Sequence, residues 1–206
     1  MKHMLRLTVF VSGRGSNLQA IHTAVSQRRL HAEIVGVVSN RSASPALEFA
    51  QTQQISRLSL EDKQAQQQGY EILAFLEQTR TDFIALAGYM KLIPPEVVTA
   101  YRHRITNIHP ALLPSFGGKG MYGRHVHEAV LSSGVKVSGA TVHLVDEEYD
   151  RGPIVMQRCV PVLDDDTPEA LATRVLEVEH TIYPEALQLF AEERVELQGN
   201  RIITRS

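Results

Sequence analysis

Short apolar runs, rich in β-branched residues, alternate along the chain with segments of helical periodicity. The runs are LRLTVFV (5–11), AEIVGVVS (32–39), DFIALAGYM (82–90), RITNIH (104–109) and ATVHLV (140–145), and the helical segments between the early ones are LQAIHTAV (18–25), ALEFAQ (46–51) and YEILAFLEQ (70–78). Apolar runs of this length, bounded by turn residues, are typical of buried strands. Their alternation with helices predicts an α/β fold with a mostly parallel central sheet flanked by helices.

Residues that favour helix ends divide the chain further. Two prolines should open a helix in PPEVVTAY (94–101), because a proline needs no amide partner in a first turn. We expect Asp62 to cap the helix that follows it, and Thr167 to cap a longer helix that begins with a proline. Pro184 is expected to kink or split that longer helix. The tail VELQGNRIITRS (195–206) predicts a short hairpin around its Gly-Asn pair.

Length and composition narrow the class of protein. The 206 residues predict one domain, residues 1–206, because α/β folds of this size commonly form a single unit. The net charge of -2, with lysine and arginine scattered, lacks the basic footprint of a nucleic-acid-binding protein. Cys159 is the only cysteine, so a disulfide within the chain is excluded and a reducing cytoplasm is expected. No stretch approaches the roughly 18 apolar residues of a membrane span, so we expect no membrane partner.

The first candidate site is the turn SGRGSN (12–17), between a predicted strand and a predicted helix. Its glycines let the backbone approach a ligand, and the helix start offers unpaired amides and a positive dipole end to an anion such as phosphate. The turn lacks the third glycine of the dinucleotide fingerprint and the lysine of a P-loop. A tight turn in which Ser16 or Asn17 merely caps the helix is the alternative.

The second candidate site is Asn107-Ile108-His109-Pro110, at the end of a predicted strand. Strand alternation places Asn107 and His109 on one side, facing the crevice where α/β proteins bind ligands. A histidine can transfer a proton near neutral pH, and an amide donor can stabilise an oxyanion. A hydrogen-bonded pair in the core is the alternative interpretation.

The third candidate combines His143, within an apolar strand, and the acidic loop DEEYDRGP (146–153) that follows it. A carboxylate in this loop could orient the imidazole of His109 or accept a proton from an attacking amine. A solvated loop beside a hydrogen-bonded core histidine would explain the same residues without chemistry.

The fourth feature is the glycine-dense segment FGGKGMYGRHVH (116–127), which we expect to be a mobile loop. Its Lys119 or Arg124 could close over a phosphate. Its histidines, His125 and His127, could join the two earlier histidines in a metal site, because imidazoles are common zinc ligands. The spacing matches no H-E-x-x-H pattern, and a histidine pair in a flexible loop usually faces solvent, so we expect no metal.

Taken together, SGRGSNLQAI, LAGYMKLI, NIHPALLP and SGATVHLVDEEYDRGPIV, in this order and spacing, resemble the folate-dependent formyltransferases over nearly the whole chain. NIHPALLP with the downstream His and Asp is typical of the wider formyltransferase and hydrolase group. The early SGRGSN and the length of the chain resemble its phosphoribosylglycinamide formyltransferases. The resemblance implies a Rossmann-like sheet, with glycinamide ribonucleotide bound by the N-terminal half and 10-formyltetrahydrofolate beside it in the C-terminal half. It implies formyl transfer in purine synthesis by a monomer or homodimer.

The resemblance also implies roles for individual residues. The catalytic group would be Asn107, His109 and Asp150, supported by His143. The ribonucleotide would be bound by Gly15, Ser16, Asn17 and Asn107, and the folate by Met90, Lys91, Leu92, Ile93, Asp146, Glu147, Glu148, Tyr149 and Asp150.

Three features depart from the family pattern. Lys91 stands where the family has an arginine, which keeps the charge but loses the planar guanidinium. Gln67 stands where the family often has an arginine that contacts phosphate or sugar, and Lys63 is a candidate replacement. The loop 117–127 is longer than the family pattern. These departures concern substrate contacts and leave the catalytic residues unchanged.

Four other functions fit part of the sequence. A formyltetrahydrofolate hydrolase shares the catalytic group but usually carries an N-terminal regulatory domain, and here the first strand begins near Leu5. A methionyl-tRNA formyltransferase would need a basic C-terminal domain. A non-catalytic nucleotide-binding module would use the glycine-rich turn and would need no Asn-His-Asp group. A metal hydrolase would lose its activity to a chelator.

Overall fold

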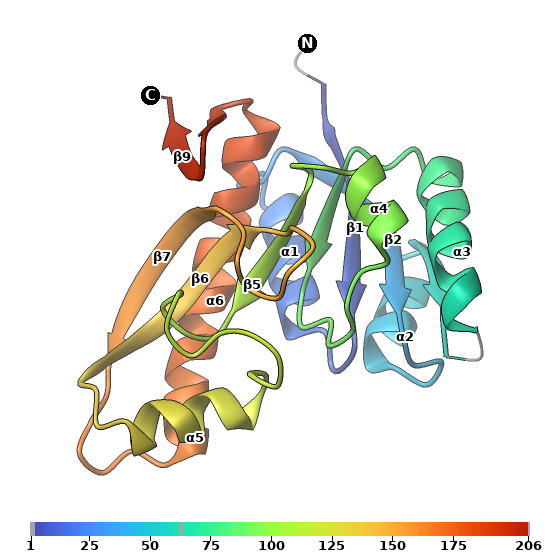
Figure 1. The fold of residues 1–206 in the computed structure, drawn as a ribbon. Coiled ribbons are helices and arrows are strands. Elements are labelled where there is room, and N and C mark those ends of the chain that lie inside the picture. The colour runs from blue at the N-terminus through green and yellow to red at the C-terminus, as the bar shows by residue number, and fades with distance from the viewer. Residues whose placement is uncertain (1–2, 62–63, 206) are drawn as a thin grey trace.

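The centre of the molecule is a seven-stranded sheet with helices against both faces (Figure 1), and the computed structural model describes residues 3–61 and 64–205. The strands are β1 (Leu5–Val11), β2 (Ala32–Ser39), β3 (Ser56–Ser59), β4 (Phe83–Leu86), β5 (Ile105–His109), β6 (Val137–Leu144) and β7 (Ile154–Pro161). Their order across the sheet is β3-β2-β1-β4-β5-β6-β7. The first five are parallel to one another, and β6 runs antiparallel to both of its neighbours, β5 and β7. The predicted mostly parallel sheet is therefore confirmed.

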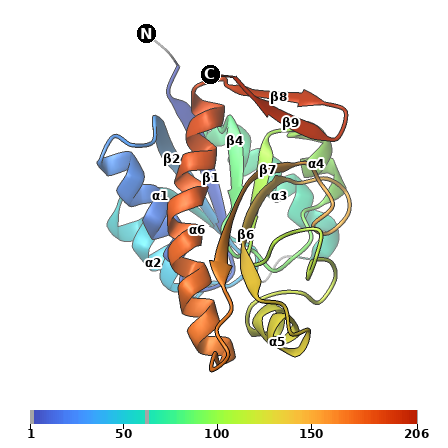
Figure 2. The same ribbon diagram turned by 90° about the vertical axis from the view of Figure 1, so that its left-hand side faces the viewer.

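The helices cover the two faces of the sheet unequally. They are α1 (Ser16–Ser26), α2 (Pro45–Thr52), α3 (Ala65–Gln78), α4 (Pro95–Ala100), α5 (Arg124–Ser132) and α6 (Pro168–Ala191). The buried side chains of α1, α2 and α6 belong to one hydrophobic core, and those of α3 and α4 belong to a second core on the other face. Figure 2 shows α6 lying lengthwise over the sheet beside α1. Both faces are thus covered, which explains why the parallel strands read as continuous apolar runs.

The run predicted as a strand over 82–90 is shorter in the structure. The strand β4 ends at Leu86, and the chain then turns at Gly88, whose φ is +76°. Tyr89 packs edge-on against Phe10, with ring centroids 5.4 Å apart. The rest of this apolar run therefore forms a wall beyond the sheet.

The strand β5 is the junction between the parallel and antiparallel parts of the sheet. It pairs in parallel with β4 and antiparallel with β6. The register places Asn107 opposite His143 and His109 opposite Thr141. Because directly paired residues project from the same face of a sheet, the junction sets the Asn107 and His143 side chains beside each other.

The predicted helix starts are confirmed where the structure describes them. The Thr167 hydroxyl accepts a hydrogen bond from the Ala170 amide at 3.2 Å, as an N-cap does. Pro95 begins α4 directly after Pro94. Asp62, the expected N-cap of α3, lies outside the described residues.

The long helix α6 continues through Pro184, so the predicted split is wrong. An internal proline removes one helical hydrogen bond. Here Tyr183 and Leu187, both fully buried, hold the helix against the sheet on either side. Within the described residues no helix, α6 included, combines the length and apolar character that a membrane crossing requires. After α6, β8 (Val195–Gln198) and β9 (Arg201–Thr204) form the predicted hairpin.

Candidate active site

A cavity of about 860 Å³ opens where β1, β4 and β5 end. Its walls comprise 13–17, 86–93, 107–110 and 118–124, together with residues of the β6–β7 loop and the first half of α6. The volume lies in the upper part of the range of about 300–1,000 Å³ for small-molecule sites. The cavity therefore has room for more than one small ligand, and it lies where the strand order predicted a crevice.

The turn between β1 and α1 forms one end of this cavity. Gly15 has φ +76°, and a Cβ there would lie 2.8 Å from the Ala46 Cβ, so the turn requires glycine. No side chain caps the start of α1. Its first amides are therefore open to a ligand, and the alternative in which Ser16 or Asn17 caps the helix is not observed.

The side chain of Asn17 points inward from this turn. Its Nδ2 donates a hydrogen bond to Oε2 of Glu179 at 2.7 Å, and both residues are buried. Burial raises the pKa of Glu179 to about 7, although the Asn17 hydrogen bond lowers it in part. Glu179 also lines the cavity, and it was not identified from the sequence. A signal existed, because this glutamate interrupts the buried stripe of α6 between Val175 and Ile182.

At the other end of the cavity, four predicted residues come together. Asn107 Nδ2 lies 3.1 Å from His143 Nε2, and His143 Nδ1 lies 2.8 Å from the Leu144 carbonyl. Since that carbonyl can only accept, Nδ1 of His143 carries a proton, and Nε2 lies beside both the Asn107 amide and Asp150. This contact orients Asn107, whose amide group has no other hydrogen bond within the described residues.

Asp150 faces both histidines. Its Oδ2 lies 3.6 Å from His109 Nδ1, and its Oδ1 lies 3.5 Å from His143 Nε2. It holds φ +57°, a left-handed conformation that aspartate tolerates better than most residues. Burial raises its pKa, but the neighbouring His143, His109 and the Gly118 amide together lower it below its usual value. Asp150 is therefore a carboxylate at neutral pH.

His109 is buried, and its Nε2 donates to the Phe116 carbonyl at 2.8 Å. Burial lowers its pKa, and the nearby Asp150 and the Phe116 hydrogen bond offset this only in part. The imidazole is thus neutral at pH 7, with its proton on Nε2.

The two histidines of the glycine-rich segment 116–127 differ in their exposure to solvent. Residues from Arg124 onward belong to α5, and alternate helical positions face different directions. His125 is exposed, whereas His127 is 4% exposed, which contradicts the expected solvent-facing pair in a flexible loop. Burial and the nearby His109 lower the pKa of His127. Among the described residues, no group of three or more His, Cys, Asp or Glu side chains is arranged to hold a metal ion.

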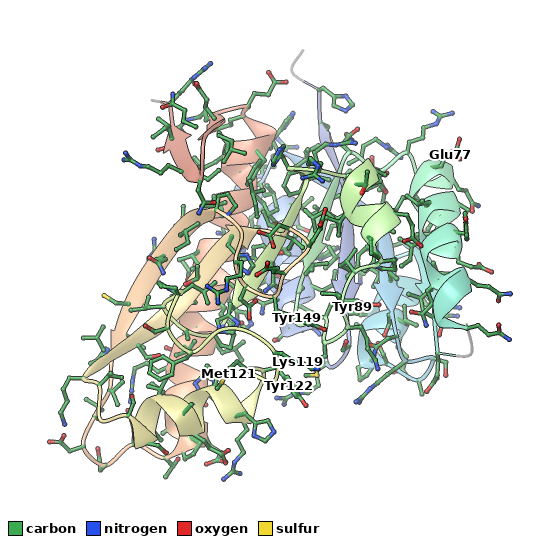
Figure 3. All side chains as sticks on the ribbon, viewed as in Figure 1. Glu77, Tyr89, Lys119, Met121, Tyr122 and Tyr149 are labelled. Carbon is green, nitrogen blue, oxygen red and sulfur yellow. The ribbon has the colours of Figure 1, made fainter. Side chains whose placement is uncertain are left out.

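The residues expected to bind folate form one side of the cavity, with one exception. Met90, Lys91, Leu92, Ile93, Asp146, Glu148, Tyr149 and Asp150 line it. Met90 and Leu92 are each 48% exposed, and Tyr149 is 41% exposed, so these three side chains offer open apolar surface among the charged residues of the wall. Figure 3 labels Tyr149 in the centre of this region. Glu147 lies outside it, 3.4 Å from the Arg102 guanidinium.

Two of the departures from the family pattern can also be placed. Lys91 lines the cavity, as expected. Gln67 is an exposed residue of α3 outside the cavity walls, and Lys63 lies outside the described residues. Among the described residues, none of those that line the cavity belongs to α3, so the contact that the family often makes with an arginine there is not made from α3.

Comparison with known proteins now adds to this geometry. The model of the formyl transferase family matches residues 5–187, most of the chain. The chain belongs to the formyl transferase family.

Members of this family resemble the chain in both sequence and fold. The chloroplastic phosphoribosylglycinamide formyltransferase of Vigna unguiculata is 45% identical over 193 residues, which is 92% of this chain but 62% of that protein. Glycinamide ribonucleotide transformylase 1 from Symbiobacterium toebii has a TM-score of 0.92 at 38% identity, covering 100% of this chain and 96% of that one. A formyltetrahydrofolate deformylase from Pseudomonas syringae pv. tomato has a TM-score of 0.90 at 26% identity, covering 99% of this chain and 67% of that one. This formyl transferase family member therefore spans less than two thirds of the curated plant relative.

Proposed function

We propose that this protein transfers the formyl group of 10-formyltetrahydrofolate to the amine of N1-(5-phospho-D-ribosyl)glycinamide, a step of purine synthesis. The observation that carries the proposal is the junction of β5 and β6, where Asn107, His109, His143 and Asp150 meet in a cavity that the glycine-rich turn before α1 also lines. The similarity to the Vigna and Symbiobacterium proteins supports the same substrates.

The ribonucleotide fits the end of the cavity formed by β1 and α1. Amides of Gly15, Ser16 and Asn17, at the positive end of the α1 dipole, would hold the phosphate. The buried Glu179 would accept hydrogen bonds from ribose hydroxyls, since a carboxylate in an apolar setting needs donors. The amine would then point toward Asn107.

The folate fits the wall that follows β4. Met90, Leu92 and Tyr149 offer apolar surface for its rings, and Lys91 offers a cation for its carboxylates. Asp146 is fixed by its own turn, in which its Oδ1 accepts from the Glu148 amide at 2.9 Å. This loop connects the folate wall directly to the catalytic Asp150.

The reaction begins when the amine attacks the formyl carbon. A C–N bond forms, and the formyl oxygen becomes an oxyanion, which the free N–H of Asn107 can stabilise. Nε2–H of neutral His109 is a second donor, and its use requires the contact with Phe116 to give way. Collapse of the oxyanion breaks the bond to N10 of the folate. The amine proton passes by way of Asp150, through water, to N10, so that atoms and charge balance.

The remaining predictions concern the setting of the reaction. We propose that the chain acts as one domain, as a monomer or homodimer, without a metal ion. Cys159 is a free cysteine, which suits a reducing cytoplasm, although the name of the Vigna relative refers to the chloroplast.

A hydrolase is the second candidate, because the Pseudomonas deformylase shares the fold. The deciding experiment follows tetrahydrofolate release from 10-formyltetrahydrofolate with the ribonucleotide, with water alone, and with a chelator present. We expect turnover that depends on the ribonucleotide and is unchanged by the chelator. Release without the ribonucleotide would identify a hydrolase, and loss with the chelator would identify a metal enzyme.

A further inference from the structure

Lys119 stands at the corner of a tight turn in the cavity wall. The Met121 amide donates to the Gly118 carbonyl at 3.0 Å, which closes a four-residue turn. Gly120, with φ +90°, occupies the position where type II turns require a positive φ. Lys119, Met121 and Tyr122 all line the cavity, and Figure 3 shows these side chains in one region with Tyr149. The sequence Gly-Lys-Gly therefore presents the lysine to the cavity on a fixed turn.

This turn is attached to the catalytic group at its base. The Gly118 amide donates to Asp150 Oδ2 at 2.9 Å, and two residues earlier the Phe116 carbonyl accepts from His109. A Cβ on Gly117 would lie 3.1 Å from the Asp150 Cβ, so the backbone packs directly against this carboxylate side chain. Lys119 thus follows immediately after a segment held in place by two catalytic residues.

The charges around the cavity leave Lys119 available. Among the described residues, the lysines and arginines that line it are Arg14, Lys91, Lys119 and Arg124. Arg124 is engaged, 2.7 Å from Glu128 and 2.5 Å from Glu169. Within residues 3–61 and 64–205, Lys119 has no hydrogen-bond or ion-pair partner. Its ammonium group is therefore free to bind a ligand.

We propose that Lys119 binds the phosphate of the ribonucleotide, opposite the amides at the start of α1; this inference rests on the proposed function. A phosphate monoester carries about −1.5 to −2 charges at pH 7. The β1–α1 turn itself supplies one cationic side chain, Arg14, and the first turn of α1 has no acidic residue. The folate wall already has Lys91 for the carboxylates of the second substrate. A second cation from the facing loop completes the charge balance at the phosphate.

The test is steady-state kinetics of Lys119→Met, which keeps the length of the side chain and removes its charge. We expect the KM for the ribonucleotide to rise about tenfold to a hundredfold, since a charge-assisted hydrogen bond has this net value. The KM for 10-formyltetrahydrofolate and the melting temperature should stay the same, and Lys119→Arg should recover part of the affinity. Lys136→Met is the matched control, because Lys136 pairs with Asp164 outside the cavity and its loss should leave both KM values unchanged.

A dephosphorylated substrate identifies the group that Lys119 contacts. With glycinamide riboside, wild type and Lys119→Met should have the same KM, because the contact is absent from both. An unchanged KM for the ribonucleotide in Lys119→Met, or a raised KM for the folate instead, would overturn this inference while the proposed function stands. Absence of formyl transfer by the wild type would overturn both.

Discussion

The two ends of the cavity differ in the part of the chain that lines them: one is lined by main chain, the other by side chains. At the end formed by β1 and α1, the main chain of the turn lines the cavity, and the side chain of Asn17 donates to Glu179. At the end formed by β5 and β6, the paired side chains of Asn107 and His143 line the cavity. An anion can be held by amides that any sequence provides, whereas a reacting carbonyl needs particular side chains in a fixed register.

The strand connections at the two ends also differ. A parallel strand followed by a helix brings a row of open amides to the carboxyl edge of the sheet. An antiparallel pair instead sets residues of two strands directly opposite each other, as β5 and β6 do. In the proposed function, the ribonucleotide phosphate is therefore bound in the parallel part of the sheet, and the reaction takes place where parallel pairing changes to antiparallel pairing.

The largest effect is expected from Asn107→Ala, which removes a side chain at the catalytic end. Loss of one preorganised donor typically lowers kcat by about 10²–10³. The variant should remain folded, because Asn107 is only partly buried. Its kcat and its melting temperature are the measurements. A variant that keeps most of its kcat would show that Asn107 is not the oxyanion donor.

At the end formed by β1 and α1, a change in the backbone should lower the stability of the fold. Gly15→Ala forces a left-handed conformation on alanine and places its Cβ 2.8 Å from the Ala46 Cβ. Strain and overpacking together should lower the free energy of unfolding by about 3 kcal/mol. Gly13→Ala is the control, because no atom lies within 4 Å of its Cβ position. Chemical denaturation of both variants measures the difference, and equal stability would contradict the role of Gly15.

The burial of the Glu179 carboxyl group, beside the turn before α1, should make the free energy of unfolding depend on pH. Burial raises its folded-state pKa to about 7, above the ordinary value of 4.5, so wild-type stability is full below pH 4.5 and decreases as the pH rises to about 7. Glu179→Gln should therefore be more stable than wild type by about 3 kcal/mol at pH 8. It should bind the ribonucleotide more weakly. Thermal denaturation at pH 4.5 and 8 tests this, and a stability difference independent of pH would contradict it.

The smallest effect concerns the buried histidines at the catalytic end. Burial lowers the folded-state pKa of His127 below 6.5, so its contribution is complete above pH 6.5 and is lost as the pH falls through the folded value. His127→Gln should therefore reduce the loss of stability between pH 7 and pH 5.5. Melting temperatures of the variant and the wild type at pH 7 and pH 5.5 measure this loss. An equal decrease in melting temperature for both proteins would show that His127 does not cause the loss of stability.

The features predicted from the sequence are those encoded locally. Strand periodicity placed Asn107 and His109 on one side of β5, and the glycines of SGRGSN predicted a tight turn between β1 and α1. The sequence could not show that Asn17 meets Glu179, because 162 positions separate them. Nor could it show that His109 bonds to the Phe116 carbonyl, since every residue has such a group. Hydrogen bonds to the main chain and contacts between distant parts of the chain cannot be predicted from the identities of single residues.

The helix α6 has a consequence for cooperativity. It packs against α1 beside the phosphate end and against β6, β7 and α5 beside the catalytic end. Unfolding of either end would expose one side of this helix, so local opening is opposed by contacts at both ends. The two ends should therefore lose their structure in one transition, and a single folding equilibrium governs how many molecules are competent for both binding and chemistry.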